Sequence, residues 1–221
     1  MEKINYQKEL DELIKSLDGK RPNLLLHACC GPCSSACLEY LYKHFQITVF
    51  YYNPNIFPPE EYFRRLNELK SLYEKFPPVL EGKIKLVECD YNPQEFYDGI
   101  EIQKNPDLAN EAEKGERCRR CYKIRLEKAY NFAKKNNFDY FCTTLSISPF
   151  KDSIKINKIG NELGGQTPNS TKWLPSDFKK NNGFKRSLEI STEYGMYRQE
   201  YCGCIFSKQN KEKIPIPKSE N

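Results

Sequence analysis

Hydrophobic and polar residues follow two different periods over the first 150 residues of the chain. Short runs of apolar, β-branched and aromatic residues predict buried strands. The stretches between these runs repeat apolar residues at the spacing of amphipathic helices. The predicted strands cover residues 23–28, 47–53, 83–90 and 138–145. The predicted helices cover residues 4–17, 34–45, 58–76, 92–103 and 116–136.

Cap and turn residues mark several helix ends. Asp18-Gly19 ends the first predicted helix, and Ser34 is expected to cap the second at its N-terminus. Prolines stand at the start of the third helix, where a missing backbone donor is tolerated. Because strands and helices alternate with short connections, the pattern predicts an α/β fold. We expect a doubly wound, mostly parallel, Rossmann-like sheet with a helical C-terminal appendage.

Four regions of the chain differ in composition. Residues 1–21 are predicted to form an N-terminal helical extension, and residues 22–150 the α/β core that carries the clustered cysteines. Residues 151–207 are more polar and basic, and we expect a helical appendage there that ends in a Cys-x-Cys pair. The last residues, 208–221, are predicted to be disordered.

The predicted strand ends carry the residues with the most chemistry. His27-Ala-Cys-Cys30 ends the first strand, Asn53-Pro54-Asn55 follows the second, Cys89-Asp90 the third and Thr143-Thr144 the fourth. Parallel sheets bind their ligands in the crevice beyond the carboxyl ends of the strands. The sequence therefore predicts one site, formed by all four strand ends.

The composition favours a reducing compartment. No stretch approaches 18 consecutive apolar residues, and the charged N-terminus lacks the apolar core of a signal peptide. We therefore expect a cytoplasmic protein without a membrane partner. Its ten cysteines then favour metal binding or redox chemistry over structural disulfides. The net charge of +5 is weak support for an anionic partner.

Two cysteine pairs are candidates for a metal site. Cys29 and Cys30 can converge only where the strand turns into a loop, and Gly31-Pro32 favours such a turn. Cys118 and Cys121 share one face at the start of a helix, where the helix dipole favours thiolates. Four thiolates could bind zinc or an iron–sulfur cluster. The wide separation of the pairs favours the cluster.

The remaining cysteines and His27 are interpreted differently. Cys202-Gly-Cys204 predicts a strained, redox-active disulfide, although a second pair of metal ligands remains an alternative. Cys89 and Cys142 lie in predicted strands and are expected to be small buried hydrophobic residues. His27 could support a ligand or move a proton, and a structural role is equally compatible with its position.

A basic segment near the C-terminus is a candidate for RNA binding. From 172 to 186, five cations stand against Asp177 and are interleaved with aromatic residues. Lys and Arg pair with phosphates, and aromatic rings stack on unpaired bases. A solvated lysine-rich surface is the alternative. The cations are Lys172, Lys179, Lys180, Lys185 and Arg186, and the aromatic residues are Trp173, Phe178 and Phe184.

Six motifs in this order resemble the cobalamin-independent epoxyqueuosine reductase family. They are HACCGPC, ERCRRCY, TTLSISPFK, INKIG, DFKKNNGFKRS and MYRQEYCGC. The resemblance runs from about residue 22 to residue 207. It implies an enzyme that reduces epoxyqueuosine to queuosine in the tRNA anticodon loop, the last step of queuosine biosynthesis, with an electron donor that the sequence does not identify.

The resemblance also implies roles for individual residues. It implies a [4Fe–4S] cluster on Cys29, Cys30, Cys118 and Cys121, and a redox-active disulfide between Cys202 and Cys204. It makes Cys33 the candidate ligand of one additional metal ion. Apart from the resemblance, the chemistry needs a proton donor that lets water leave; Tyr201, Tyr197 or His27 could serve, and the sequence assigns none of them. We expect tRNA binding at Lys179, Lys180, Lys185, Arg186 and Arg198.

Two other functions are compatible with parts of the sequence. An ATP-using tRNA thiolase would share a doubly wound sheet, but it needs a Gly- and Ser-rich phosphate loop after the first strand. This chain has CCGPCSS at that place, which is poor in glycine and rich in thiols. A zinc-stabilised RNA-binding protein without catalysis is the other alternative.

Overall fold

A parallel β-sheet forms the centre of the molecule. In this computed structural model, which describes residues 4–165, 167 and 170–212, the sheet has the strand order β3-β2-β1-β4-β5. Every neighbouring pair of strands is parallel, which confirms the predicted fold class. The strands are β1 (Asn23–Ala28), β2 (Gln46–Tyr51), β3 (Lys85–Glu88), β4 (Tyr140–Thr143) and β5 (Lys172–Trp173).

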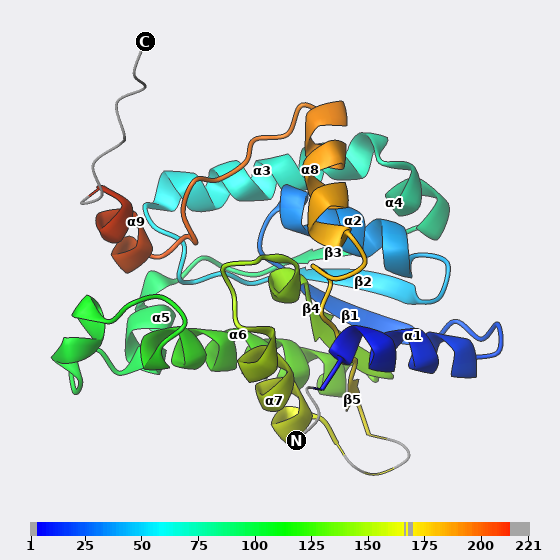
Figure 1. Cartoon of the computed structure of the whole chain (residues 1–221), viewed down its shortest axis with the longest axis horizontal. Coiled ribbons are helices and arrows are strands. Elements are labelled where there is room, and N and C mark those ends of the chain that lie inside the picture. Colours follow the sequence, from blue (N-terminus) through cyan, green and yellow to red (C-terminus); the bar gives the residue numbers. More distant parts are fainter. Residues whose placement is uncertain (1–3, 166, 168–169, 213–221) are drawn as a thin grey trace.

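Helices cover both faces of the sheet (Figure 1). Helices α2, α3 and α8 lie over one face, and α6 and α7 over the other. The helices are α1 (Tyr6–Ser16), α2 (Gly31–Leu41), α3 (Pro59–Lys75), α4 (Pro77–Gly82), α5 (Pro93–Ile100), α6 (Glu116–Lys135), α7 (Ser153–Leu163), α8 (Gly183–Glu193) and α9 (Ile205–Glu212). Two 3₁₀ turns, η1 (Pro106–Asn110) and η2 (Thr144–Ile147), follow α5 and β4.

The central strand β1 is buried on both faces. Leu24 and Leu26 pack into the cluster beneath α2 and α3, whereas Leu25 packs into the cluster beneath α6. This alternation follows from the two-residue period of a strand. A strand buried on both sides is typical of a parallel sheet and explains the uninterrupted apolar run in the sequence.

Helix α2 begins earlier than the sequence predicted. It starts at Gly31, and the sulfur of Cys30, not the hydroxyl of Ser34, caps its N-terminus. A Cβ at Gly31 would lie 3.1 Å from the backbone oxygen of Glu68, so glycine permits the close approach of α2 to α3. The early start places the second and third cysteines of HACCGPC at the N-terminus of a helix.

The segment 151–207 contributes a strand as well as helices. The sequence did not predict β5, which pairs with β4 and extends the sheet by one edge strand. Asn157 of α7 fixes it, because its side-chain oxygen accepts a hydrogen bond from Trp173 Nε1 at 3.0 Å.

Of the tail predicted to be disordered, residues 208–212 belong to α9, and residues 213–221 lie outside the described residues. No described helix is long and apolar enough to span a membrane.

Candidate metal and redox site

Three thiols converge where β1 passes into α2. The sulfur atoms of Cys29, Cys30 and Cys33 lie within 4.8 Å of one another, and those of Cys29 and Cys30 are 3.8 Å apart. The first two side chains are only 6% and 1% exposed. The strand end turns both vicinal thiols to one side, and the first helical turn adds the third. Within the part of the chain that the structure describes, these three cysteines form a group of closely spaced side chains that could hold a metal ion.

The three thiols shift one another's pKa values. Hydrogen bonds from Cys30 and Cys33 hold the pKa of Cys29 well below its ordinary value. Burial and the neighbouring Cys29 raise the pKa of Cys30 to about 12, and the hydrogen bonds to Cys29 and Cys30 raise that of Cys33. One thiolate is therefore stabilised by two thiol donors. Such a group can bind a soft cation once the remaining protons leave.

His27 lies near the end of β1, two residues before Cys29, and both of its ring nitrogens have partners within the protein. It is fully buried, its Nε2 is 2.9 Å from the backbone oxygen of Tyr52, and its Nδ1 is 2.8 Å from the hydroxyl of Thr143. Because a carbonyl only accepts, Nε2 carries the proton and Thr143 donates to Nδ1. Burial lowers the pKa of His27 to about 4. The neutral ring thus joins the ends of β1, β2 and β4.

Cys118 and Cys121 stand in the first turns of α6, as the sequence predicted, but do not join the group of three. Cys118 packs in the same hydrophobic cluster as Cys29 and Cys30. Burial, with a smaller contribution from nearby thiols, raises the pKa of Cys118 to about 11 and of Cys121 to about 12. Burial therefore outweighs the expected effect of the helix N-terminus at both thiols.

The Cys202-Gly-Cys204 segment crosses over the strand ends as a pair of free thiols. Gly203 has a φ of +132°, which L side chains rarely adopt, and a Cβ there would lie 3.0 Å from Arg65 Nη1. The guanidinium of Arg65 donates to the backbone oxygens of Cys202 at 3.2 Å and Tyr201 at 3.4 Å. Arg65 is 1% exposed and pairs with Glu61 at 2.7 Å. A buried ion pair thus clamps the segment in place.

Gln199 links this segment to the three thiols. Its Nε2 donates to the sulfur of Cys30 at 3.2 Å and to that of Cys33 at 3.8 Å. The sequence analysis assigned no role to this glutamine, which appeared only inside the motif MYRQEYCGC. The contact joins residues 169 positions apart, so no local pattern could reveal it.

Cations lie near the thiols, among them the buried Arg125 and the partly buried Lys151. Arg125 is 2% exposed and donates to the backbone oxygen of Cys121, while its Nη2 has no hydrogen-bond partner in the described structure. Burial alone would lower the pKa of Lys151, but the nearby thiols of Cys202, Cys29 and Cys33 raise it. Positive charge and an unused donor beside clustered thiols suit a bound group that carries negative charge. The donor set therefore fits a thiolate-bound metal or cluster.

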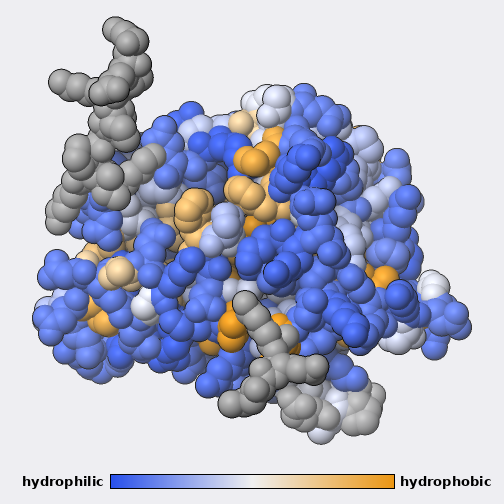
Figure 2. Space-filling model, viewed as in Figure 1, coloured by the Kyte–Doolittle hydropathy of each residue, from blue (hydrophilic) through white to orange (hydrophobic). Residues whose placement is uncertain are grey.

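A cavity of about 450 Å³ opens beside the cysteines. Cys33 and Cys202 line it, together with Lys151, Gln199 and Tyr201. Figure 2 shows apolar side chains gathered between α8 and α9 on a face that is otherwise largely hydrophilic. Thus a thiol from the group of three and one from the Cys-x-Cys pair border the same space. A concave site with an apolar lining and a few polar side chains is typical of a small-ligand site.

The model of the epoxyqueuosine reductase QueH family matches residues 24–210 of this chain. The chain belongs to this family. The matched range includes both thiol groups, the α6 pair and the cavity. The resemblance seen in the sequence motifs is thereby confirmed, and the tRNA thiolase alternative receives no support.

Curated members of the QueH family align with most of the chain. Epoxyqueuosine reductase QueH of Streptococcus pyogenes serotype M1 is 41% identical over 93% of this chain and 79% of that protein. The protein of the same name from Staphylococcus epidermidis is 39% identical over 93% of this chain and 85% of its own length. That of Thermotoga maritima is 30% identical over 83% of this chain and 89% of its own length.

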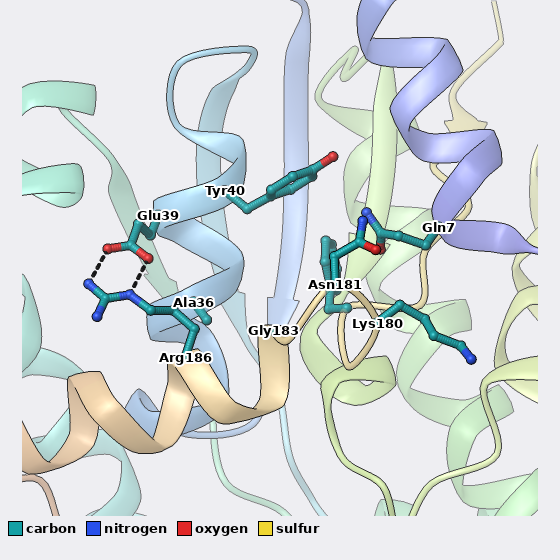
Figure 3. A pocket seen from close by; sticks show the side chains of 9 residues that line it. Gln7, Ala36, Glu39, Tyr40, Lys180, Asn181, Gly183 and Arg186 are labelled. Carbon is teal, nitrogen blue, oxygen red and sulfur yellow. Dashed lines mark hydrogen bonds and ion pairs between the residues drawn. The ribbon is translucent and has the colours of Figure 1, made fainter.

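Several cations that the sequence analysis assigned to tRNA binding have protein partners. Arg186 pairs with both carboxylate oxygens of Glu39, at 2.8 and 2.7 Å (Figure 3). Lys179 pairs with Asp177, and Arg198 donates to the Ser191 hydroxyl at 2.9 Å. These interactions anchor the segment to the protein, which a count of charges along the sequence does not reveal.

The remaining two cations of that set are available to a ligand. In the described part of the chain, the ammonium groups of Lys180 and Lys185 form no hydrogen bond or ion pair. Of the interleaved aromatic residues, Trp173 and Phe178 are each 5% exposed and cannot stack on a base. Phe184 lines the cavity. The exposed aromatic residue nearby is Phe150, for which the sequence analysis proposed no function.

Proposed function

We propose that this chain reduces the epoxide of epoxyqueuosine in tRNA to the alkene of queuosine. The observation that carries the proposal is the single cavity that both Cys33 and Cys202 line. Removing the epoxide oxygen as water requires two electrons and two protons. Oxidation of Cys202 and Cys204 to a disulfide releases the same number of each, so one dithiol balances one turnover. An electron donor of unassigned identity must then reduce the disulfide.

We propose that Cys29, Cys30, Cys118 and Cys121 hold a [4Fe–4S] cluster, and that Cys33 binds one additional metal ion. The support is the soft donor set, the packing of Cys118 against Cys29 and Cys30, and the unused donor of Arg125. When bound, such a cluster supplies one-electron transfer at low potential. The compact group formed with Cys33 is compatible with a second metal beside the cluster.

The protein side chains have separable tasks in this proposal. Arg65 holds the backbone of Cys202 against the strand ends, and Gln199 fixes the distance between that segment and Cys30. Lys151 lines the cavity as a cation and can donate a hydrogen bond to the substrate oxygen as its bond to carbon breaks. Of the three proton-donor candidates, Tyr201 is the one that lines the cavity, although its hydroxyl donates to the backbone oxygen of Phe57. The Tyr197 hydroxyl donates to Glu61, and His27 is buried.

The proposed partners are a tRNA that carries epoxyqueuosine and a separate electron donor. Lys180 and Lys185 support the first of these, because they are lysines of the basic segment whose charges are not used within the described protein. The cytoplasmic location expected from the sequence stays a prediction.

An anaerobic preparation tests the function. The protein should be brown and contain iron and sulfide, and it should convert epoxyqueuosine in tRNA to queuosine when a chemical reductant is supplied. Digestion of the tRNA to nucleosides, followed by mass spectrometry, measures the conversion. A colourless zinc protein that binds tRNA but leaves the nucleoside unchanged would instead support the non-catalytic alternative.

A further inference from the structure

The rim of the cavity carries an apolar ring that the protein leaves exposed. Phe150 is 68% exposed, more than the other large hydrophobic side chains of the described residues, and it lines the cavity together with Cys33 and Cys202. A single exposed hydrophobic residue needs no explanation by itself. This one stands at the entrance to the thiols, where a bound molecule would cover it.

The loop that presents Phe150 is ordered by hydrogen bonds. The backbone N–H of Phe150 donates to the Ser148 hydroxyl at 3.3 Å, and that of Lys151 donates to the Ser148 carbonyl at 3.2 Å. Lys114 donates to the backbone oxygen of Pro149 at 3.3 Å, from the loop that precedes α6. The backbone that carries the ring is therefore ordered before a ligand arrives, which lowers the entropy that binding would cost.

The two sides of this loop differ in charge and polarity. On one side, the apolar cavity has a second aromatic wall, Phe184, from the first turn of α8. On the other side lies a hollow of about 440 Å³, lined by Lys114, Lys151, Lys179 and Lys180 against Asp152 and Asp177. Lys151 lines both spaces. An aromatic platform next to a cationic hollow matches a nucleotide, which has a flat base and an anionic phosphate.

We propose that Phe150 is the residue on which the modified base of the substrate stacks, and that the hollow behind its loop receives the neighbouring backbone phosphate. The inference rests on the proposed function, since it takes the anticodon loop of a tRNA as the ligand. Unpaired loop bases can be splayed out and stacked on aromatic side chains. The cavity volume lies within the range of about 300–1,000 Å³ that is usual for small-ligand sites.

A double-mutant cycle between the protein and the RNA tests the stacking. Affinities of the complete, anaerobically reconstituted protein are measured for an anticodon stem-loop RNA and for the same RNA with an abasic site at the target position. Removal of one stacking interaction is expected to weaken binding on the order of ten-fold. Phe150→Ala should show this weakening with the intact RNA, and should then bind the abasic RNA almost equally well.

Matched variants separate stacking from other causes. Phe150→Trp should restore affinity for the intact RNA, because the larger ring also stacks. Phe63→Ala removes another exposed ring, on α3, and should keep the wild-type preference for the intact RNA. The decrease in affinity in Phe150→Ala should be the same factor at every salt concentration, because stacking releases no counterions.

The possible failures are distinguishable. If Phe150→Ala loses affinity and the abasic site causes the same further decrease as in the wild type, Phe150 does not touch the base and the inference is wrong. The inference is equally wrong if Phe150→Ala binds both RNAs like the wild type. If neither the wild type nor Phe63→Ala binds the stem-loop RNA at all, the proposed function itself fails.

Discussion

The two thiol groups that border the cavity are held by different kinds of structure. Cys29, Cys30 and Cys33 are fixed by a buried strand end and the first turn of α2. Cys202 and Cys204 belong to an irregular segment, and the side chain of Arg65 on α3 and the backbone N–H of Phe57 hold it by hydrogen bonds. The first group is part of the fold, whereas the second is docked onto it.

This difference corresponds to what each group would have to do in the proposed reaction. A metal-binding group gains from ligands that are already in place, because little ordering remains to be done. A dithiol that becomes a disulfide must move its two sulfur atoms together, since a bonded pair lies about 2 Å apart. Cys204 is buried in a cluster with Phe96 and Phe206, outside the sheet, so movement of Cys202 toward it need not disturb the strands. Variants of each group test this separation.

The largest expected effect follows from changing the group that is part of the fold. Cys30→Ser should remove most of the iron and essentially all activity, because it replaces a soft ligand and alters the N-cap of α2. Cys142→Ser is the matched control. Cys142 is also fully buried, but its sulfur lies 3.4 Å from the Ser176 hydroxyl, away from the group of three. Metal analysis and turnover measurements check both variants, and full iron content in Cys30→Ser would contradict the assignment.

The next effect concerns the buried clamp. Arg65→Met leaves the Glu61 carboxylate buried without its cation, with the Tyr197 hydroxyl as its remaining partner in the described structure, so unfolding should become easier by roughly 3–5 kcal/mol. Cys202 and Cys204 should also react faster with an alkylating agent, because the segment loses the hydrogen bonds from Arg65 to the backbone oxygens of Tyr201 and Cys202. Arg64→Met, the exposed neighbour on α3, should change stability by less than about 1 kcal/mol. Denaturant unfolding and timed alkylation provide the measurements, and unchanged alkylation rates would speak against a docked segment.

A smaller effect is expected from the glycine between the paired cysteines. Gly203→Ala should lower stability by roughly 1–3 kcal/mol, because its φ of +132° is unfavourable and the new Cβ would crowd Arg65. Gly195→Ala is a useful comparison, since its φ is +61° but nothing lies within 4 Å of its Cβ position. Only Gly203→Ala should shift the reduction potential of the Cys202–Cys204 couple. Equal potentials in both variants would mean that the glycine has no redox role.

The smallest effect concerns the surface. Lys180→Ala combined with Lys185→Ala should flatten the dependence of log affinity for tRNA on log salt by roughly 0.7–0.9 for each phosphate that is no longer paired. The control is Lys134→Ala with Lys135→Ala, an equal charge change at the C-terminal end of α6. Titrations at several salt concentrations distinguish them. If both double variants flatten the slope equally, the effect reflects net charge and not a binding surface.

The sequence predicted those parts of the fold that depend on local pattern. The apolar run of β1 and the period of α6 were sufficient to locate both elements. The two-residue strand β5 has no such signal, because a long-range hydrogen bond from Trp173 to Asn157 fixes it. The start of α2 was missed because a cysteine sulfur replaces the usual hydroxyl cap.

The parts of the candidate site that depend on local motifs were predicted, whereas those that depend on contacts between distant residues were not. Vicinal cysteines before Gly-Pro indicated converging thiols, and the structure brings Cys29 and Cys30 together with Cys33. The clamp by Arg65 could not be predicted, because it reaches backbone groups that lie 136 and 137 positions away in the sequence. Charge counting also overestimated the free cations of segment 172–186, since Glu39 lies far from Arg186 in sequence and next to it in space.

The central claim is that Cys202 and Cys204 supply the electron pair, while the thiols at the start of α2 hold metal. A single-turnover experiment tests it most directly. Reduced, metal-loaded protein is mixed anaerobically with tRNA that carries epoxyqueuosine, with no external reductant, and is quenched with an alkylating agent for mass spectrometry. The account predicts that queuosine forms while Cys202 and Cys204 become protected from alkylation in equal amount. Queuosine formed with both cysteines still fully alkylated would contradict it.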